Sequence, residues 1–312
     1  MDVLSDVLAV SGVRGSAGAR IGAAGTWGVS WSGDRDAIFY AVTAGMAYLT
    51  PDGEPARLLM AGDLVLLPTG VAHSLSSEPG AEIHSCDVVA AEKARQEGAL
   101  LRLGDGDVHT HVLGASYSHD PATSTPVFTL LPRVIHVRAH AADPDLSDTV
   151  RLLGRELARP RIATNVILDR FVDVLLVQLL RAWLESGTTP DTSWWGVLRD
   201  PVLLDAVTKI HEHPEHPWTT ESLAREVAVS KTTLNRRFVA RTGQSPGTYL
   251  TRWRMNIAAR RLRDTDDSLE SVAESVGYTS VYAFSRAFHR ERKLPPARYR
   301  SSARQVLITD KS

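Results

Sequence analysis

The sequence lacks three features that would place the protein outside the cell interior or in a membrane. Its 312 residues include one cysteine, Cys86, so no disulfide can form within the chain. This excludes a disulfide-stabilised secreted domain and is typical of a reducing cytosol. The densest apolar stretch, 172–180, is far shorter than the roughly 20 residues that span a bilayer. The first six residues contain two acids and no base, unlike a secretory signal. We therefore expect a cytoplasmic protein with no membrane partner.

Net charge is also nearly absent, but the two signs are separated along the chain. The 35 basic and 36 acidic residues give a charge of −1 overall. Residues 201–312 hold 19 of the basic and 12 of the acidic residues, which leaves 16 and 24 in residues 1–200. This asymmetry indicates that the C-terminal third binds a polyanion, although a chance imbalance would give the same numbers. With 43% apolar residues, the length predicts two or three globular domains.

Residues 1–140 carry the pattern of a β-rich domain. The segment 26–31 alternates with period two, which places Trp27, Val29 and Trp31 on one face of a strand. Further strands are predicted between turn sequences, at 37–42, 64–67 and 83–89. Several short strands at close intervals predict a sandwich or a small barrel.

Residues 141–200 change to helical periodicity. One helix is predicted from Leu146 and a second over 166–184, and the short break between them makes an antiparallel pair. Apolar side chains in the second helix occupy more than one stripe. Either this helix is buried on two faces, or one face is a dimer interface. The segment 185–191 is predicted to be a linker.

Residues 201–304 are predicted to be helical and contain two copies of one unit. Residues 223–229 match 272–278 at an offset of 49. Each copy predicts a helix, a tight turn and a second helix, which Ser230 caps in the first copy and Thr279 or Ser280 caps in the second. This is helix-turn-helix geometry, in which the second helix enters the major groove of DNA. A helix over residues 247–262 joins the copies.

The second helix of each copy supplies the candidate DNA contacts. Leu234, Phe238, Phe284 and Phe288 recur at a spacing of four and are predicted to face the core. The positions left facing outward are Lys231, Thr232, Asn235 and Arg236 in the first copy and Val281, Tyr282, Ser285 and Arg286 in the second. Asparagine reads an adenine edge, and arginine reads a guanine edge. Arginines of the joining helix are predicted to bind phosphates, namely Arg252, Arg254, Arg260, Arg261 and Arg263.

The stretch Trp218–Arg300 resembles the AraC/XylS family of bacterial transcription regulators. The resemblance is carried by Arg236-Arg237-Phe238, Gly243-x-Ser245-Pro246, Val276-Gly277-Tyr278 and Phe284-Ser285-Arg286-Ala287-Phe288. It implies two helix-turn-helix units joined by one helix, and sequence-specific binding of double-stranded DNA. Lys293 departs from the family pattern, which has glycine at this helix C-terminus.

Residues 62–73 fit the pattern G-x5-P-x-G-x2-H and resemble the second motif of cupin barrels. In metal-dependent cupins the histidine at the position of His73 is a ligand, together with a His-x-His and a glutamate of the first motif. The corresponding strand, 39–45, has neither. We therefore expect no metal, no cofactor and no enzyme activity. His109 and His111 are interpreted as a solvated surface pair rather than as metal ligands.

Resemblance to cupin-type regulators implies a barrel that senses a small-molecule effector or a redox signal. Trp27, Trp31, Tyr40 and His73 are predicted to line a ligand pocket; alternatively, these side chains fill the barrel as core. Cys86, on the predicted strand 83–89, is either a small buried apolar residue or a redox sensor. The absence of a second cysteine favours the first interpretation.

Together these patterns predict an α+β, multi-domain chain with three regions. They are a cupin-like β-barrel sensor domain at 1–140, a helical linker and dimerisation region at 141–200, and an all-α DNA-binding domain with two helix-turn-helix units at 201–304. The predicted function is sequence-specific transcription regulation by a homodimer, with RNA polymerase as a partner if the protein is an activator. Two alternatives stay open: a cupin metalloenzyme fused to a DNA-binding module, and an architectural protein that binds DNA without sequence preference.

Overall fold

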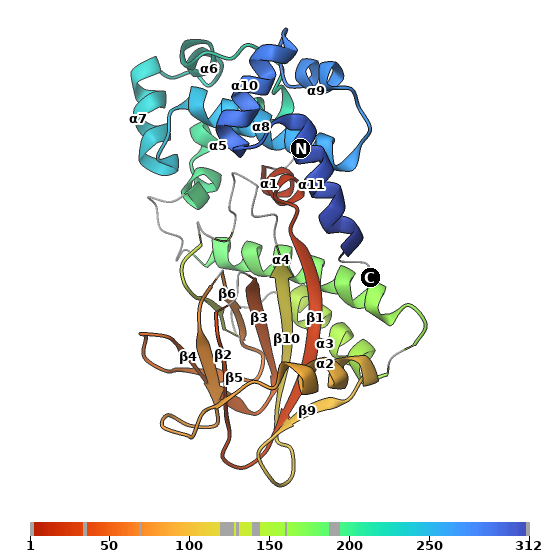
Figure 1. Cartoon of the computed structure of the whole chain (residues 1–312). Coiled ribbons are helices and arrows are strands. Elements are labelled where there is room, and N and C mark those ends of the chain that lie inside the picture. Colours follow the sequence, from red (N-terminus) through yellow and green to blue (C-terminus); the bar gives the residue numbers. More distant parts are fainter. Residues whose placement is uncertain are drawn as a thin grey trace. The chain divides into compact units, whose positions relative to one another are not determined.

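The computed structural model describes residues 3–33, 36–68, 70–118, 128, 131–138, 144–159, 161–186 and 194–309 (Figure 1). The chain divides into two compact units. One consists of residues 14–118 and 131–189, and the other of residues 1–13, 119–130 and 190–312. The predicted α+β fold class, a β-rich N-terminal region followed by helices, is confirmed. No helix in the described ranges has the length and apolar character needed to cross a membrane.

The first unit is built on two antiparallel-rich sheets. The six-stranded sheet has the order β11 (Ile135–Val137), β6 (Leu64–Leu67), β3 (Ala37–Ala44), β10 (Thr110–Ser118), β1 (Arg14–Ala23) and β9 (Leu100–Leu103). The five-stranded sheet has the order β5 (Arg57–Met60), β4 (Met46–Pro51), β7 (His73–Ser76), β2 (Gly28–Trp31) and β8 (His84–Ser85). Inward side chains of both sheets, such as Val42, Leu49 and Leu75, form one apolar core. Burying this shared face holds the sheets together, because neither sheet can hide its apolar side alone.

The strands expected at 26–31, 37–42 and 64–67 are present, but the strand expected at 83–89 is wrong. Only His84 and Ser85 pair with β2. Helix α2 (Val88–Glu97) begins immediately afterwards, because the Asp87 carboxylate accepts a hydrogen bond from the Ala90 amide at 2.9 Å and caps it. Cys86 therefore lies between a strand and a helix instead of within a strand.

Two further helices pack in the same unit, α3 (Pro144–Ala158) and α4 (Thr164–Glu185). Helix α4 lies against β1 and α3. The Tyr117 hydroxyl donates a hydrogen bond to the Val172 carbonyl oxygen at 2.9 Å, and the Gly15 amide donates to the Asp173 carboxylate at 3.0 Å. A Cβ on Gly15 would lie 2.3 Å from the Val172 side chain, so this contact requires glycine. Most of the predicted linker, 187–191, lies outside the described residues.

The second unit is helical. Its elements are α1 (Val3–Ser11), the 3-10 helix η3 (Trp194–Arg199), α5 (Pro201–Glu212), α6 (Thr220–Glu226), α7 (Lys231–Thr242), α8 (Pro246–Asp264), α9 (Leu269–Ser275), α10 (Val281–Arg292) and α11 (Pro296–Thr309). The sequence did not predict α1, which packs against α5 and α8. The sequence led us to expect domain boundaries at residues 140 and 200. The division into two units differs from these boundaries, because α3 and α4 group with the sheets and α1 groups with the C-terminal helices.

Candidate nucleic-acid interface

The first helix-turn-helix consists of α6 and α7. Ser230 caps α7, since its hydroxyl accepts a hydrogen bond from the Thr233 amide at 3.1 Å. Leu234 and Phe238 are fully buried. Their spacing of four turns the opposite face of α7 outward, and the predicted contact residues on it are all exposed: Lys231, Thr232, Asn235 and Arg236.

The second helix-turn-helix consists of α9 and α10. Its turn requires a glycine, because Gly277 has φ +77° and a Cβ there would lie 2.5 Å from the Glu215 carbonyl oxygen. Ser280, not Thr279, caps α10. Phe284 and Phe288 are fully buried, as the spacing predicts.

The predicted contact residues of α10 differ in exposure. Tyr282 is 72% exposed and Arg286 is exposed, whereas Val281 and Ser285 are partly buried. The Arg286 guanidinium carbon lies 5.8 Å from the centre of the Tyr282 ring, so the cation and the aromatic face are neighbours. The outward faces of α7 and α10 therefore present different chemistry.

Helix α8 connects the two helix-turn-helix units, and its 19 residues span about 28 Å. Its buried side chains include Leu250, Trp253 and Ala258. A buried polar contact that the sequence did not predict joins α8 to α10: Arg292 donates to the Asn256 side-chain oxygen at 2.5 Å. Because both partners are buried, separating them would leave polar groups unsatisfied, which fixes how α10 sits on α8.

Most of the α8 arginines expected to bind phosphate are engaged within the protein. Arg254 donates to the Pro214 carbonyl oxygen at 2.6 Å, and Arg263 lies 2.7 Å from Asp264. Arg252 lies 3.6 Å from Glu291. Arg260 is the member of this set for which the described residues offer no polar partner. Internal contacts therefore already hold the guanidinium groups of most of these arginines, and their binding to phosphates stays a prediction.

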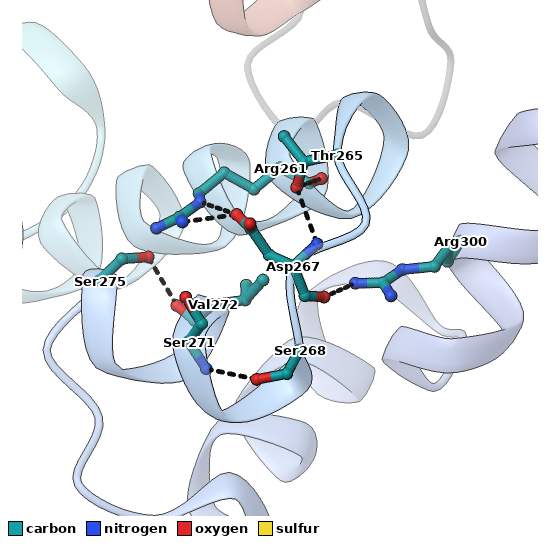
Figure 2. Close-up of polar contacts among 8 residues, drawn as sticks. All are labelled: Arg261, Thr265, Asp267, Ser268, Ser271, Val272, Ser275 and Arg300. Atoms are coloured by element: carbon teal, nitrogen blue, oxygen red, sulfur yellow. Dashed lines mark hydrogen bonds and ion pairs between the residues drawn. The ribbon is translucent and has the colours of Figure 1, made fainter.

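Figure 2 shows how Arg261 is used at the C-terminal end of α8. It donates to one Asp267 carboxylate oxygen at 2.9 and 2.5 Å, which lowers the pKa of that carboxyl. Arg300 of α11 donates to the Asp267 carbonyl oxygen at 2.5 Å, and the Asp267 amide donates to Thr265 at 3.3 Å. Ser268, the next residue, caps α9. The loop that enters the second helix-turn-helix is thus held by α8 and by α11.

A basic hollow beside α7 was not predicted. It measures about 620 Å³, and its lining includes Arg199, Arg236, Arg237 and Arg241 together with Asp200. Arg237 lies 3.6 Å from Asp200, which caps α5. Arg199 reaches this surface through the packing of η3 against α7, which no local sequence signal reveals.

In the first unit, three of the four predicted pocket residues lie together. The His73 ring lies 5.4 Å from the Trp31 ring, measured between centres, and 2.9 Å separates the His73 Nε2 atom from the Tyr40 hydroxyl. The Val71 carbonyl oxygen, 2.8 Å from Nδ1, can only accept, so Nδ1 carries the proton and Nε2 accepts from Tyr40. Burial lowers the pKa of His73. Trp27 packs in the apolar core.

The remaining single residues are placed as follows. Cys86 is partly buried, and this burial raises the pKa of its thiol, contrary to what a redox sensor needs. His109 is exposed and His111 is partly buried at the start of β10. Within the described residues, no three His, Cys, Asp or Glu side chains are gathered as metal ligands would be.

The sheets of the first unit and the paired helix-turn-helix units define a class of protein, a transcription regulator with an N-terminal domain of cupin type. Residues 2–185 match the family model described as Cupin, and residues 223–302 match the one described as Helix-turn-helix domain. The chain is 36% identical over 306 residues to an AraC-like transcription regulator of Streptomyces lividans, covering 96% of this chain and 98% of that one. It therefore belongs to the AraC-like, DNA-binding transcription regulators.

Two other proteins illustrate the range of similarity. The chain is 30% identical over 313 residues to the transcriptional regulator MtrA of Neisseria gonorrhoeae, covering 98% of this chain and all of that one. Among solved structures, the DNA-binding domain of AdpA in complex with a target DNA is 32% identical, covers 34% of this chain and 95% of that one, and has a TM-score of 0.32.

Proposed function

We propose that this regulator acts as a homodimer whose helices α7 and α10 enter successive major grooves of its operator, under control of a signal at the cupin unit. One observation carries the proposal. Both helices bury their apolar side chains in the interior of the helical unit, and they expose different polar side chains. Successive major-groove entries are about 34 Å apart. Helix α8 runs without a break between the two helix-turn-helix units, which favours a fixed distance between α7 and α10.

Sequence specificity is proposed over architectural binding because the two outward faces differ. The first carries Asn235 and Arg236, and the second carries Tyr282 and Arg286. A protein that binds only the phosphate backbone does not need different base-reading side chains on its two helices.

The test begins with selection of genomic DNA fragments by the full-length protein at about 0.15 M salt, a concentration at which non-specific binding is weak, followed by footprinting. We expect two protected patches per protein copy, about one helical turn apart. Failure to enrich any fragment, with or without the cell extract that would supply an effector, would contradict sequence-specific regulation.

The Arg236→Ala variant assigns the readout of the first patch. If Arg236 reads a base, the variant loses about 1–3 kcal/mol of binding free energy for the selected site. It also loses its preference among the four bases at one position of that site. Arg102→Ala is the matched control, since Arg102 is an exposed arginine of β9 in the other unit. Equal weakening on selected and scrambled duplexes would instead assign Arg236 to phosphate contact.

Three finer parts of the proposal concern the dimer, RNA polymerase and the predicted ligand-lining residues. Helix α4 exposes Val166, Ile167 and Val174, which supports dimerisation through this face. A contact with RNA polymerase follows if the protein is an activator, and transcription from the selected promoter in a purified system decides between activation and repression. Trp27, Trp31, Tyr40 and His73 remain a predicted ligand-lining set, although the Tyr40 hydroxyl and both His73 ring nitrogens already have hydrogen-bond partners, which favours the interpretation as core.

A further inference from the structure

A pocket of about 440 Å³ lies between helix α3 and the six-stranded sheet, within the cupin unit. This volume is in the range of small-molecule sites. The sheet side is formed by residues of β1, β3, β6 and β10 with Gly62, and the helix side by one face of α3. The predicted residues Trp27, Trp31, Tyr40 and His73 do not line this pocket.

The charged side chains that line the pocket all have one sign. They are Arg20 from β1 and Arg151 and Arg155 from α3, and His111 from β10 adds an imidazole. No aspartate or glutamate is among the fifteen described residues that line it. This is the reverse of the surrounding sequence, because residues 1–200 contain 24 acidic and 16 basic residues.

The guanidinium group of Arg20 has a buried donor without a hydrogen-bond acceptor among the described residues. Its Nε atom is buried and has no hydrogen-bond partner among the described residues, and its Nη2 atom donates only to the Gly98 carbonyl oxygen, at 3.3 Å. Burial lowers the pKa of this guanidinium. A partly buried arginine without a carboxylate is costly, and an anion in the pocket would relieve that cost.

The two helix arginines differ in how far they are neutralised. Arg151 pairs with Asp148, one turn earlier on α3. Arg155 is exposed, and the described part of the chain provides no ion pair for it. Arg20 and Arg155 are therefore the two cations available to a ligand, one from each wall of the pocket.

The rest of the lining suits an apolar body. Leu64, Leu113 and Val150 are buried apolar residues that border the pocket. Gly154 lines it on the α3 side, and a Cβ at this position would lie 3.6 Å from the Leu113 side chain, at ordinary contact distance. The absence of a side chain at residue 154 leaves the space between helix and sheet open.

We propose that this pocket binds a small organic anion, an apolar body that ends in one carboxylate, sulfonate or phosphate group, with Arg20 and Arg155 holding the anionic end. Arginine recognises such planar or tetrahedral anions through charge-assisted hydrogen bonds. The inference rests on the proposed control of DNA binding by a signal at the cupin unit and gives that signal a chemical class. Helix α3 forms one wall and packs on α4, so an occupant that touches α3 can affect the helical pair.

The experiment uses a pair of probes that differ in charge. The anion 8-anilinonaphthalene-1-sulfonate and the uncharged N-phenyl-1-naphthylamine have similar apolar bodies, and both fluoresce more strongly in apolar sites. We expect the full-length protein to bind the anion, with Arg20→Gln weakening binding about tenfold or more, as expected for loss of a charge-assisted contact. Binding of the uncharged probe should change little in the same variant.

Two further variants separate the pocket from other apolar surface. Gly154→Leu places a side chain in the pocket and should abolish anion binding, whereas Gly154→Ala adds only a Cβ and should leave the helix intact. Arg102→Gln, which removes an exposed arginine outside the pocket, should bind the anion like the parent protein. Anion affinity that is unchanged in both Arg20→Gln and Gly154→Leu would overturn the proposal.

Fragment selection with the parent protein keeps the two proposals apart. If genomic sites are enriched but the anion binds independently of Arg20 and Gly154, only the pocket inference fails. If the anion binds as expected but no DNA fragment is enriched, the proposed regulation fails and the pocket remains.

Discussion

Acidification from pH 7 to pH 5 is expected to destabilise the helical unit, because that unit buries a neutral histidine. His211 of α5 is almost completely enclosed, and its ring stacks on Trp253 with 3.6 Å between ring centres. The Nε2 atom lies 2.9 Å from the Tyr249 hydroxyl, and the Nδ1 atom lies 3.3 Å from the Asp6 carboxylate. A neutral ring with its proton on Nδ1 satisfies both contacts, since it donates to Asp6 and accepts from Tyr249.

The size of the effect follows from the displaced pKa. Burial lowers the pKa of His211 from 6.5 to about 3. Between these values the unfolded chain binds a proton that the folded chain rejects, so the free energy of unfolding decreases as the pH falls. The limiting slope is about 1.4 kcal/mol per pH unit, which gives a loss of about 2 kcal/mol between pH 7 and pH 5. The contribution of neutral His211 to the stability of the folded chain is fully present above pH 6.5.

The assay compares the full-length protein with His211→Gln, whose amide cannot titrate. Urea unfolding followed by tryptophan fluorescence at several pH values should show the parent losing about 2 kcal/mol relative to the variant by pH 5. The imidazole resonances of native His211 provide a direct check by NMR. If His211 of the folded protein titrates near or above pH 6.5, the reasoning is refuted. The Asp6 carboxylate would then raise the pKa of His211 by at least as much as burial lowers it.

Two further predictions concern positions whose backbone or exposure the structure defines. Lys293→Gly should raise stability by about 1 kcal/mol, because Lys293 ends α10 with φ +58° where the equivalent Gly243 ends α7 with φ +71°. Thermal unfolding measures this, and a lower midpoint would contradict it. Ile167→Asp should convert dimers to monomers in sedimentation experiments, since this side chain is 41% exposed on α4. The matched control is Asn165→Asp on another face of the helix, and a monomeric parent protein would rule out the dimer.

Local sequence signals were sufficient for the helix-turn-helix units. The capping serines Ser230 and Ser280 and the spacing of Phe284 and Phe288 are properties of a few consecutive residues, and helices obey such short-range rules. The strand expected at 83–89 is wrong because Asp87 caps a helix that begins at Val88, and helix-forming residues follow this cap. Val88 and Val89 are in fact 69% and 80% exposed.

The sequence by itself thus determined the class of fold, the paired helix-turn-helix units and the residues that face outward from α7. Tertiary structure alone decided which distant segments meet. Asp6 reaches His211 across 205 positions, Arg292 finds Asn256, and Arg20 lies across a pocket from Arg155. These contacts depend on how whole elements pack, and no periodicity or cap within a single element encodes them.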